Sequence, residues 1–311
     1  MFQPSYIETY KKGILEKRIE AAYKIIENCH LCPRNCRVNR LAEERGTCKT
    51  GKHAIVSSYN PHFGEEDPLV GTHGSGTIFM AWCNLLCIFC QNYEISHMGE
   101  GREVTSEEFA NMMLSLQKIG CHNINFVTPT HVIPQILSAL TIAIEGGLHI
   151  PLVYNTGCYD VIKSLKLLDG IFDIYMPDFK YWEGEVAEKY SHAKNYPIAA
   201  RAALKEMYRQ VGDLKMDERG IAYRGLLVRH LVMPHNLAGT RNIMRFLAKE
   251  ISPNTYVNVM PQYRPCGLAY KYPEINRSIT TDEYNEAIQM AIEEGITRLD
   301  ERKGIRIIRW L

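Results

Sequence analysis

Residues Gly76–Glu94 read GTIFMAWCNLLCIFCQNYE, and this segment sets the architecture expected for the rest of the chain. Its first part, TIFMAW, is an uncharged apolar run and predicts a buried strand. Its second part holds Cys83, Cys87 and Cys90, with three and then two residues between them. Ligands of α/β folds bind at the carboxyl ends of the strands. Three thiols directly after a buried strand therefore predict a binding or catalytic site.

Downstream of this segment the sequence alternates between apolar runs with strand character and amphipathic runs with helix character. After 77–82, the predicted strands span residues 122–128, 150–156, 172–181, 226–232, 255–260 and 304–310. The predicted helices span residues 106–120, 131–147, 159–170, 183–211, 239–251 and 280–295. Thr105 or Ser106 and Thr280 or Thr281 are expected to cap two of these helices. About six such units predict an α/β fold, a partial (β/α)6 barrel of parallel strands, with a doubly wound sheet as the alternative.

The N-terminal residues 1–70 are predicted to form a cysteine-rich extension that precedes the barrel of residues 71–311. An amphipathic helix is expected over residues 1–28, and residues 50–74 have the scattered Gly, Pro and His of an irregular segment. Four thiolates can close a tetrahedral zinc site or hold a complete auxiliary iron–sulfur cluster. The spacing Cys-x2-Cys-x3-Cys-x11-Cys leaves zinc, an iron–sulfur cluster and no metal open. The four cysteines are Cys29, Cys32, Cys36 and Cys48.

The overall composition argues against several classes of protein. The chain has 311 residues and a net charge of +1, so it lacks the basic character of most nucleic-acid-binding proteins. No window approaches the roughly 18 apolar residues of a membrane-spanning helix, and the polar N-terminus lacks the pattern of a signal peptide. We therefore predict a cytoplasmic protein without a membrane partner. In that compartment, clustered cysteines indicate metal binding rather than disulfides.

Three clustered thiols suit a particular metal chemistry. Thiolates bind iron–sulfur clusters, and a cluster of four irons has four ligand positions. Three thiolates would leave one iron open to chelate the amino and carboxylate groups of S-adenosylmethionine (SAM). An electron from the cluster would then break the sulfonium C–S bond and yield a carbon radical, while the protein supplies orientation and excludes water. The alternative is a zinc site that His73 or His97 completes.

The segment CNLLCIFC resembles the Cys-x3-Cys-x-aromatic-Cys motif of the radical SAM superfamily, with Phe89 as the aromatic residue. The resemblance covers about residues 71–311. It implies a 4Fe-4S cluster on the three cysteines, SAM as a second cofactor, and an electron donor such as flavodoxin or ferredoxin. Further segments resemble the activase-like branch of the pyruvate formate-lyase activating enzyme group. They are GSGTIFMAWCNLLCIFCQNYEIS, NFVTPTHVIPQIL, LVYNTGCYD, DIYMPDFKY, GLLVRHLVMP and VNVMPQYRP.

The same resemblance suggests SAM-binding roles for residues at the ends of the second and third barrel strands. In the superfamily the second strand often ends in a Gly-Gly-Glu-like turn that holds the SAM amino group. Thr128 and Thr130 stand at that place here, with a β-turn and a helix cap as the alternative. Asn155 ends the third strand, where its amide could bond ribose hydroxyls or a carboxylate. A simple turn-forming asparagine is the alternative for Asn155.

The fourth and fifth strands carry the charged candidates. Asp178 and Lys180 resemble the Asp-x-Lys of the activating enzymes, in which the lysine helps to neutralise the SAM carboxylate, and strand alternation puts both on one face. Arg229 lies inside an apolar strand and needs an anion, either SAM or a structural carboxylate. His230 is expected to point to the opposite face. A salt bridge at the surface is the alternative for Asp178 and Lys180.

Beyond the sixth strand, the segment MPQYRPCG is expected to shape the substrate pocket. Gln262, Tyr263 and Arg264 stand near the open face, and Cys266 is a candidate redox group or hydrogen-atom donor. The other single cysteines, Cys121 and Cys158, are interpreted as small buried hydrophobic residues.

These patterns predict an enzyme that cleaves SAM to a 5′-deoxyadenosyl radical, which removes hydrogen from a substrate. The resemblance implies that this substrate is a glycyl-radical enzyme. The alternative is modification of a small molecule, a peptide or an RNA, and the low net charge weighs against RNA. A protein without enzymatic activity, either an iron–sulfur electron carrier or a zinc-bearing assembly module, would give Asp178, Lys180 and Arg229 no reason to converge.

Overall fold

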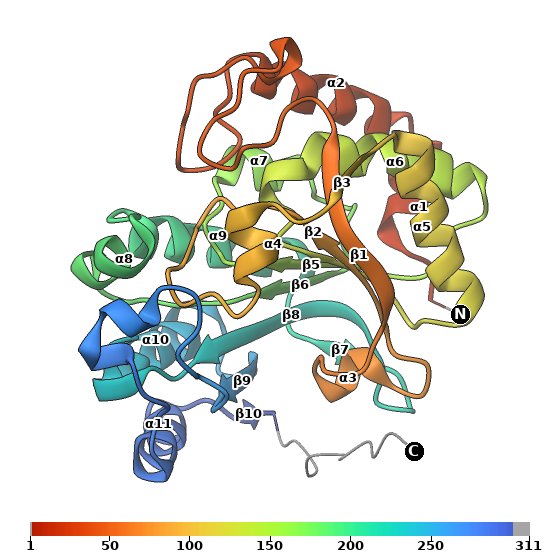
Figure 1. Cartoon of the computed structure of the whole chain (residues 1–311). Helices are drawn as coiled ribbons and strands as arrows, with labels where there is room; N and C mark the ends of the chain where they lie inside the picture. Colours follow the sequence, from red (N-terminus) through yellow and green to blue (C-terminus); the bar gives the residue numbers. More distant parts are fainter. Residues whose placement is uncertain (1, 301–311) are drawn as a thin grey trace, which may run out of the picture.

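A computed structural model of the chain describes residues 2–300, and an open, mostly parallel sheet lies at its centre (Figure 1). Six strands run parallel and lie side by side in the order of the chain. They are β2 (Ser75–Met80), β4 (Ile124–Val127), β5 (Leu152–Thr156), β6 (Ile174–Pro177), β8 (Ala222–Leu231) and β9 (Tyr256–Met260). A doubly wound sheet would reverse its strand order part-way, so the observed order confirms the predicted α/β fold of the partial-barrel type.

Further strands join this sheet, both at its edges and beside β8. β10 (Arg298–Leu299) runs parallel to β9, and β7 (Lys215–Met216) runs antiparallel to β8. At the other edge β1 (Ala54–His62) is antiparallel to β2, and β3 (Arg102–Val104) pairs with β1. Within residues 2–300, β3 and β10 therefore end the sheet on opposite sides, and it does not close. The strand predicted at 304–310 lies outside the described residues.

Strand β1 corrects the prediction of an irregular segment over residues 50–74. Only its first three residues are buried, and Ser58, Tyr59 and Asn60 are exposed towards the other end of the strand. Pro61 is tolerated there because an edge position does not require its missing N–H. The sequence of β1 therefore lacks the alternation of apolar and polar residues that indicates a half-buried strand. The strand is recognisable only from its pairing with β2. Since β1 precedes residue 70, the predicted N-terminal part contributes directly to the sheet.

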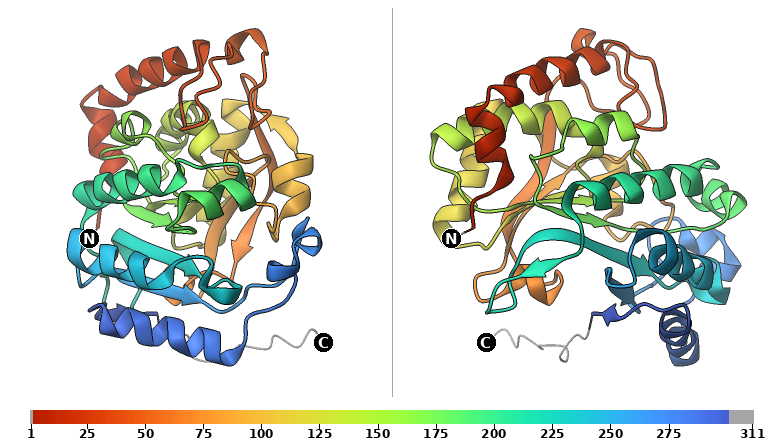
Figure 2. Two further views of the ribbon diagram at one scale, coloured as in Figure 1. Left: turned by 90° about the vertical axis from the view of Figure 1, so that its left-hand side faces the viewer. Right: turned by 180° about the vertical axis from the view of Figure 1, so that it is seen from behind.

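Helices follow the parallel strands and cover the outer face of the sheet (Figures 1 and 2). Thr105 and Thr280 each accept a hydrogen bond from the backbone N–H three residues on, and Glu108 and Glu283 complete two capping boxes. The predicted caps at these two threonines are thus confirmed. The helices are α4 (Tyr93–Met98), α5 (Ser106–Ile119), α6 (Ile133–Glu145), α7 (Ile162–Lys166), α8 (Gly184–Ser191), α9 (Tyr196–Val211), α10 (Thr240–Phe246) and α11 (Thr281–Glu293).

Two helix predictions were wrong in extent. The long helix predicted over residues 183–211 is two helices, because His192 ends α8 in a left-handed conformation and Pro197 stands in the first turn of α9. Proline fits that position because its missing N–H would have no helical partner. The helix predicted over residues 159–170 is confined to α7, and a turn begins at Leu167 directly after it.

The N-terminal segment forms two helices where one was predicted. Gly13 has a φ of 66° and separates α1 (Ser5–Lys11) from α2 (Ile14–Glu27). α2 packs against α6, on the outer layer of the barrel (Figure 2). The backbone N–H and hydroxyl of Ser5 both donate to Asp173 Oδ1, at 3.1 and 2.6 Å, just before β6. The N-terminus is thereby fastened to the end of the barrel opposite the carboxyl ends of the strands. A short α3 (Asp67–Val70) follows β1.

Among the helices of the described residues, none is both long enough and apolar enough to cross a membrane.

His230 faces away from the carboxyl-end cavity, as strand alternation predicted, and this placement gives a test. Its side chain is fully buried, and its two nitrogens lie 2.9 Å from Phe179 O and Thr240 Oγ1. Burial lowers the pKa of His230 to about 4. A histidine with a lowered pKa stabilises the fold above its unfolded pKa of about 6.5, and that contribution is lost as the pH falls through 4.

We expect a His230→Asn variant to lose less stability than the wild type between pH 6.5 and pH 4, by up to about 3 kcal/mol. Denaturant unfolding at several pH values measures this difference. The matched control is His149→Asn at an exposed histidine. Equal acid sensitivity of the His230 and His149 variants would show that His230 does not titrate with unfolding.

Candidate functional site

A cavity of about 400 Å³ lies at the carboxyl ends of the parallel strands. This volume is within the roughly 300–1,000 Å³ of ordinary ligand pockets. One wall is formed by residues 81–92, which we call the cysteine loop, and the others by the ends of β4, β5, β6, β8 and β9. The polar side chains along these walls include His62, Glu65, Cys83, Cys87, Cys90, Thr128, Asn155, Asp178, Lys180, Arg229, Gln262 and Arg264.

The cysteine loop brings all three predicted thiols into this cavity. Cys83, Cys87 and Cys90 are free, and each of them lines it. The loop is held from two sides, because Ile88 N–H donates to Tyr190 O at 2.9 Å and Ile88 O accepts from Leu268 N–H at 2.7 Å. These bonds come from segments far along the chain. The thiols are therefore presented by a loop whose path is set by tertiary contacts.

Two residues of the loop adopt backbone conformations that are uncommon for their type. Trp82 has a φ of 67° and Leu86 a φ of 58°, each directly before a cysteine. Residues with side chains rarely occupy this left-handed region, and such conformations concentrate at functional sites. Gly99 makes room for Trp82, since a Cβ at Gly99 would lie 2.2 Å from the indole ring. The local strain is thus supported by packing around the turn.

Burial disfavours the thiolate form of Cys83 and Cys90. It raises the pKa of Cys83 to about 12, and the neighbouring Cys87 and Cys90 act in the same direction. Burial and Cys87 also raise the pKa of Cys90. Three free thiols that line one cavity form a donor set that becomes thiolate when a cationic centre binds.

The donor set fits an iron–sulfur cluster better than the zinc alternative. Tetrahedral zinc draws its ligands to about 2.3 Å from one point. Such a site would need a fourth ligand beside the three thiolates, and His73 and His97 are the candidates from the sequence. Neither histidine is among the residues that line the cavity, since His73 contacts His122 and His97 stacks on Tyr93. A cluster spreads its thiolates over separate irons, which suits three thiols around one cavity.

Four of the predicted SAM-site residues lie together in the cavity. Arg229 donates from Nε to Asp178 Oδ1 at 2.6 Å and from Nη2 to Asn155 Oδ1 at 2.7 Å. Lys180 Nζ donates to Asp178 Oδ2 at 2.7 Å. Burial opposes ionisation of Asp178, but Arg229 and Lys180 outweigh it and hold the pKa of this carboxyl below its ordinary value. Asp178 is thus a carboxylate between two cations.

Two glutamates belong to this network, although the sequence interpretation did not identify them. Glu65 Oε2 accepts from Arg229 Nη1 at 3.2 Å, and Glu66 Oε1 accepts from Asn258 Nδ2 at 2.7 Å. Both precede α3, in the segment predicted to be irregular. They link the β1 side of the open sheet to β8 and β9 on its other side. The only local signal was a Glu-Glu-Asp run before the apolar α3, which is common at helix starts.

The network also explains the protonation of these acids. Burial raises the pKa of Glu66, although Arg229 opposes the shift. Burial acts in the same direction on Glu65, but His62 and Arg229 outweigh it and lower its pKa. His62 Nδ1 lies 3.4 Å from Glu65 Oε1. Glu65 therefore lies on the cavity wall as a carboxylate between His62 and Arg229.

The two predicted threonines are placed differently. Thr128 lines the cavity, with a φ of 62°. Thr130 lies behind it in a buried network, where its hydroxyl donates to Asp160 Oδ1 at 2.8 Å. Tyr154 and Thr156 donate to the same carboxyl group, at 2.8 and 2.7 Å. The hydroxyl of Thr130 therefore bonds a buried carboxyl group, and within residues 2–300 it forms no helix-capping bond.

Of the remaining candidate residues, some line the cavity and others do not. Phe89 lines the cavity, and its ring meets Tyr181, Tyr190 and Tyr263 edge to face, at 5.6 to 6.5 Å between centroids. Gln262, Tyr263 and Arg264 also line the cavity, but Cys266 is not among the lining residues. Cys158 is fully buried, as interpreted from the sequence.

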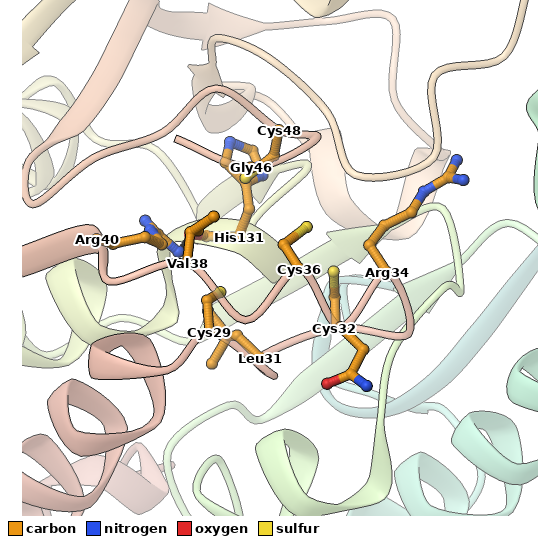
Figure 3. Close-up of a pocket in the computed structure, with 11 residues that line it drawn as sticks. Cys29, Leu31, Cys32, Arg34, Cys36, Val38, Arg40, Gly46, Cys48 and His131 are labelled. Carbon is orange, nitrogen blue, oxygen red and sulfur yellow. Dashed lines mark hydrogen bonds between the residues drawn. The ribbon is translucent and has the colours of Figure 1, made fainter. Parts of the chain in front are cut away.

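The four N-terminal cysteines gather around a second, much smaller cavity (Figure 3). Cys29, Cys32 and Cys48 are buried and Cys36 is half-buried. The loop is closed by two backbone bonds, in which Cys29 N–H donates to Val38 O and Arg37 N–H donates to Cys29 O, both at 2.9 Å. This cavity is distinct from the one at the strand ends.

Sequence comparison places the three cysteines within a known family. "Uncharacterized protein MJ0674" of Methanocaldococcus jannaschii is 35% identical over 294 residues, which cover 92% of this chain and 80% of that protein. The family model described as "Radical SAM superfamily" matches residues 77–214. The chain belongs to the radical SAM superfamily. The superfamily implies a 4Fe-4S cluster and SAM as cofactors, in agreement with the donor set of the cysteine loop.

The radical SAM match begins in β2 and ends just after α9, so it includes the cysteine loop, Asn155, Asp178 and Lys180. Among solved structures, the crystal structure of HydG, a maturase of the [FeFe]-hydrogenase, matches with a TM-score of 0.49 and 14% identity. The match covers 71% of this chain and 49% of HydG, so the chain spans about half of that protein.

Proposed function

We propose that this radical SAM enzyme cleaves SAM reductively, and that the resulting radical removes a hydrogen atom from a glycyl-radical enzyme and thereby activates it. One observation carries the cleavage: three free thiols share a cavity of about 400 Å³ with the Asp178, Lys180, Arg229 and Asn155 network. Motif resemblance to the activating enzymes supports the choice of substrate. Modification of a small molecule, a peptide or an RNA is the rival.

Each part of the cavity has a role in this proposal. When bound to Cys83, Cys87 and Cys90, a 4Fe-4S cluster would supply the electron that breaks the sulfonium C–S bond of SAM and leaves the 5′-deoxyadenosyl radical. Lys180 lies on the cavity wall and would neutralise the SAM carboxylate. Asn155 would bond the ribose or the carboxylate. Phe89 and its aromatic neighbours would exclude water from the reaction.

The proposal also includes an electron donor and a cellular compartment. The reductant would be a low-potential carrier such as flavodoxin or ferredoxin. All ten cysteines are free thiols, which suits a reducing compartment such as the cytoplasm.

Anaerobic reconstitution tests the proposed function. The protein is loaded with iron and sulfide and reduced, and its EPR spectrum is recorded with and without SAM while 5′-deoxyadenosine is assayed. We expect a changed cluster signal and formation of 5′-deoxyadenosine. An EPR signal of the reduced cluster that SAM does not change would favour an electron carrier and overturn the proposal.

The substrate needs a separate test. Purified pyruvate formate-lyase serves as the probe glycyl-radical protein, with reduced flavodoxin as electron source. Activation would produce a glycyl-radical EPR signal in the added protein. Formation of 5′-deoxyadenosine without that signal would leave cleavage intact and contradict this substrate.

Lys180 provides a test of the cavity that is independent of the substrate. A Lys180→Ala variant should keep its cluster but bind SAM about 10-fold to 100-fold more weakly, because a bond to a charged group contributes roughly 1.5–3 kcal/mol. Titration of the cluster EPR signal with SAM measures the affinity. The control is Lys205→Ala, which removes an exposed lysine paired with Glu250. Wild-type affinity in the Lys180 variant would remove Lys180 from the SAM site.

A further inference from the structure

The small cavity of the N-terminal segment is surrounded by four sulfur atoms. Cys29, Cys32, Cys36 and Cys48 all line it, together with Arg34, Arg40 and His131, and the guanidinium of Arg34 points away from the sulfur atoms (Figure 3). Thr47 N–H points at Cys36 Sγ from 3.4 Å, the kind of bond that stabilises a thiolate. The cavity measures about 10 Å³, which is room for about one water molecule. Neither the radical SAM match nor the proposed reaction uses this group.

Arg40 supplies a first independent sign that an anion belongs here. Its side chain is only 1% exposed. Its nitrogens donate to Gly51 O at 3.2 and 3.0 Å and to His131 O at 2.9 Å, which are neutral acceptors. In residues 2–300 no ion pair is formed by Arg40, whereas the buried Arg229 has three carboxylates around it. A buried cation without a counter-charge is costly, so a negative group next to Arg40 would stabilise the fold.

His131 supplies a second sign. It is 1% exposed and lines the same cavity. Its Nε2 lies 3.0 Å from Ala81 O, and because a carbonyl only accepts, Nε2 carries the proton. Its Nδ1 is buried and has no hydrogen-bond partner among the described residues. At metal centres, a histidine commonly donates the N–H of one ring nitrogen to a backbone carbonyl. The lone pair of its second ring nitrogen is then free, as it is at Nδ1 of His131.

We propose that Cys29, Cys32, Cys36 and Cys48 hold a second metal centre, a thiolate-bound zinc ion or iron–sulfur cluster, whose occupancy positions the cysteine loop. Four thiolates around either group leave net negative charge, which Arg40 balances. In the described residues the four thiols surround the cavity without converging on one point. Zinc would draw them inward and a cluster would spread them apart.

The link to the cysteine loop is direct. Arg34 stands between Cys32 and Cys36 in the sequence, and it donates to Asn84 O at 2.8 Å and to Leu85 O at 2.9 Å. These two carbonyls lie between Cys83 and Cys87. The bond from His131 to Ala81 O holds the chain two residues before Cys83. A metal that orders the four-cysteine segment therefore also orders the loop that carries the other three thiols. Arg34 acts in this proposal as a positioning residue.

Metal content of a full-length variant tests the first half of the proposal, which does not depend on the proposed function. The variant carries Cys83→Ala, Cys87→Ala and Cys90→Ala and is loaded with Zn²⁺ alone, or with Fe²⁺ and sulfide. We expect one zinc per chain, or iron with acid-labile sulfide, and the two results distinguish the centres. Adding Cys36→Ala should reduce the bound metal several-fold, whereas adding Cys121→Ala should not. A folded triple variant that retains no stoichiometric metal would overturn the proposal.

Should the triple variant fail to fold, Cys36→Ala alone in the otherwise wild-type chain keeps the first half falsifiable. Total metal should fall relative to wild type and Cys121→Ala. Unchanged total metal in a folded Cys36→Ala variant would overturn the site.

The positioning role of Arg34 has its own readouts. Arg34→Met should lower iron loading of the three-cysteine site several-fold at limiting iron and alter the EPR line shape of its reduced cluster. Arg34→Lys, which keeps a donor, should restore part of the loading. The control is Arg37→Met, an exposed arginine of the same segment. Wild-type loading and line shape in Arg34→Met would contradict the coupling, whether or not SAM is cleaved.

Discussion

A Cys87→Ala variant is expected to lose both its SAM-binding cluster and all cleavage of SAM. Cys87 is the most buried of the three thiols in the cysteine loop, and its charge would act directly on Lys180. With two thiolates left, the site falls below the three ligands that an open-iron cluster requires. Formation of 5′-deoxyadenosine should therefore drop to the level of a sample without enzyme. The assay is run after anaerobic reconstitution, with iron content measured on the same sample.

The control for this variant is Cys121→Ala. Cys121 is also a buried free thiol, but its Sγ faces His73 O at 3.8 Å, and it does not line the cavity. Its replacement tests whether losing any buried cysteine impairs the protein. Turnover that persists in a reconstituted Cys87→Ala sample would disprove the assignment of the three ligands, whatever the control shows.

An Arg229→Met variant is expected to lower the free energy of unfolding by about 3–5 kcal/mol, because it leaves buried carboxylates without their cation. Arg229 Nε lies 2.6 Å from Asp178, and its Nη1 lies 3.2 Å from Glu65 and 4.0 Å from Glu66. Methionine fills a similar volume without the charge. Thermal or denaturant unfolding of samples with matched metal content measures the loss.

The pH dependence of this loss follows from the pKa of Asp178. In the wild type, Arg229 and Lys180 hold this pKa below its ordinary value of 3.8. Their contribution to stability is therefore present above that value and is lost as the pH falls further. The difference between wild type and Arg229→Met should shrink in acid, as the carboxylates become protonated.

The control for Arg229 is Arg219→Met. Arg219 also forms an ion pair, at 2.8 Å from Asp217, but its side chain is 74% exposed. An exposed pair of this kind contributes roughly 0–1 kcal/mol. If Arg229→Met costs no more than Arg219→Met, the buried network does not stabilise the fold as inferred.

Much of the barrel could be predicted from local patterns. The apolar runs before Cys83, Thr128 and Asn155 became parallel strands, because strands buried on both faces need continuous apolar sequence. The caps at Thr105 and Thr280 followed from bonds within four residues. Apolar strands and helix caps depend on neighbours in the sequence, so they can be predicted before the fold is known.

The grouping of Asn155, Asp178, Lys180 and Arg229 was also expected, since the carboxyl ends of parallel strands share one edge. The order of the strands could not, however, predict that Glu65 pairs with Arg229. Glu65 comes from the other side of the open sheet, and no periodicity connects the two residues. Nor could the local sequence show that the hydroxyl of Thr130 bonds Asp160, 30 residues further along the chain.

The local sequence was thus sufficient for the strand–helix alternation, the three-cysteine loop and the family to which they belong. The tertiary structure alone established β1 as a strand, brought Glu65 to Arg229, and set Arg34 and His131 against the backbone of the cysteine loop. The reason is physical. Propensity, capping and short cysteine spacing are properties of neighbouring residues, whereas charge pairing and backbone support join segments separated by 50 to 164 residues, whose approach only the folded chain defines.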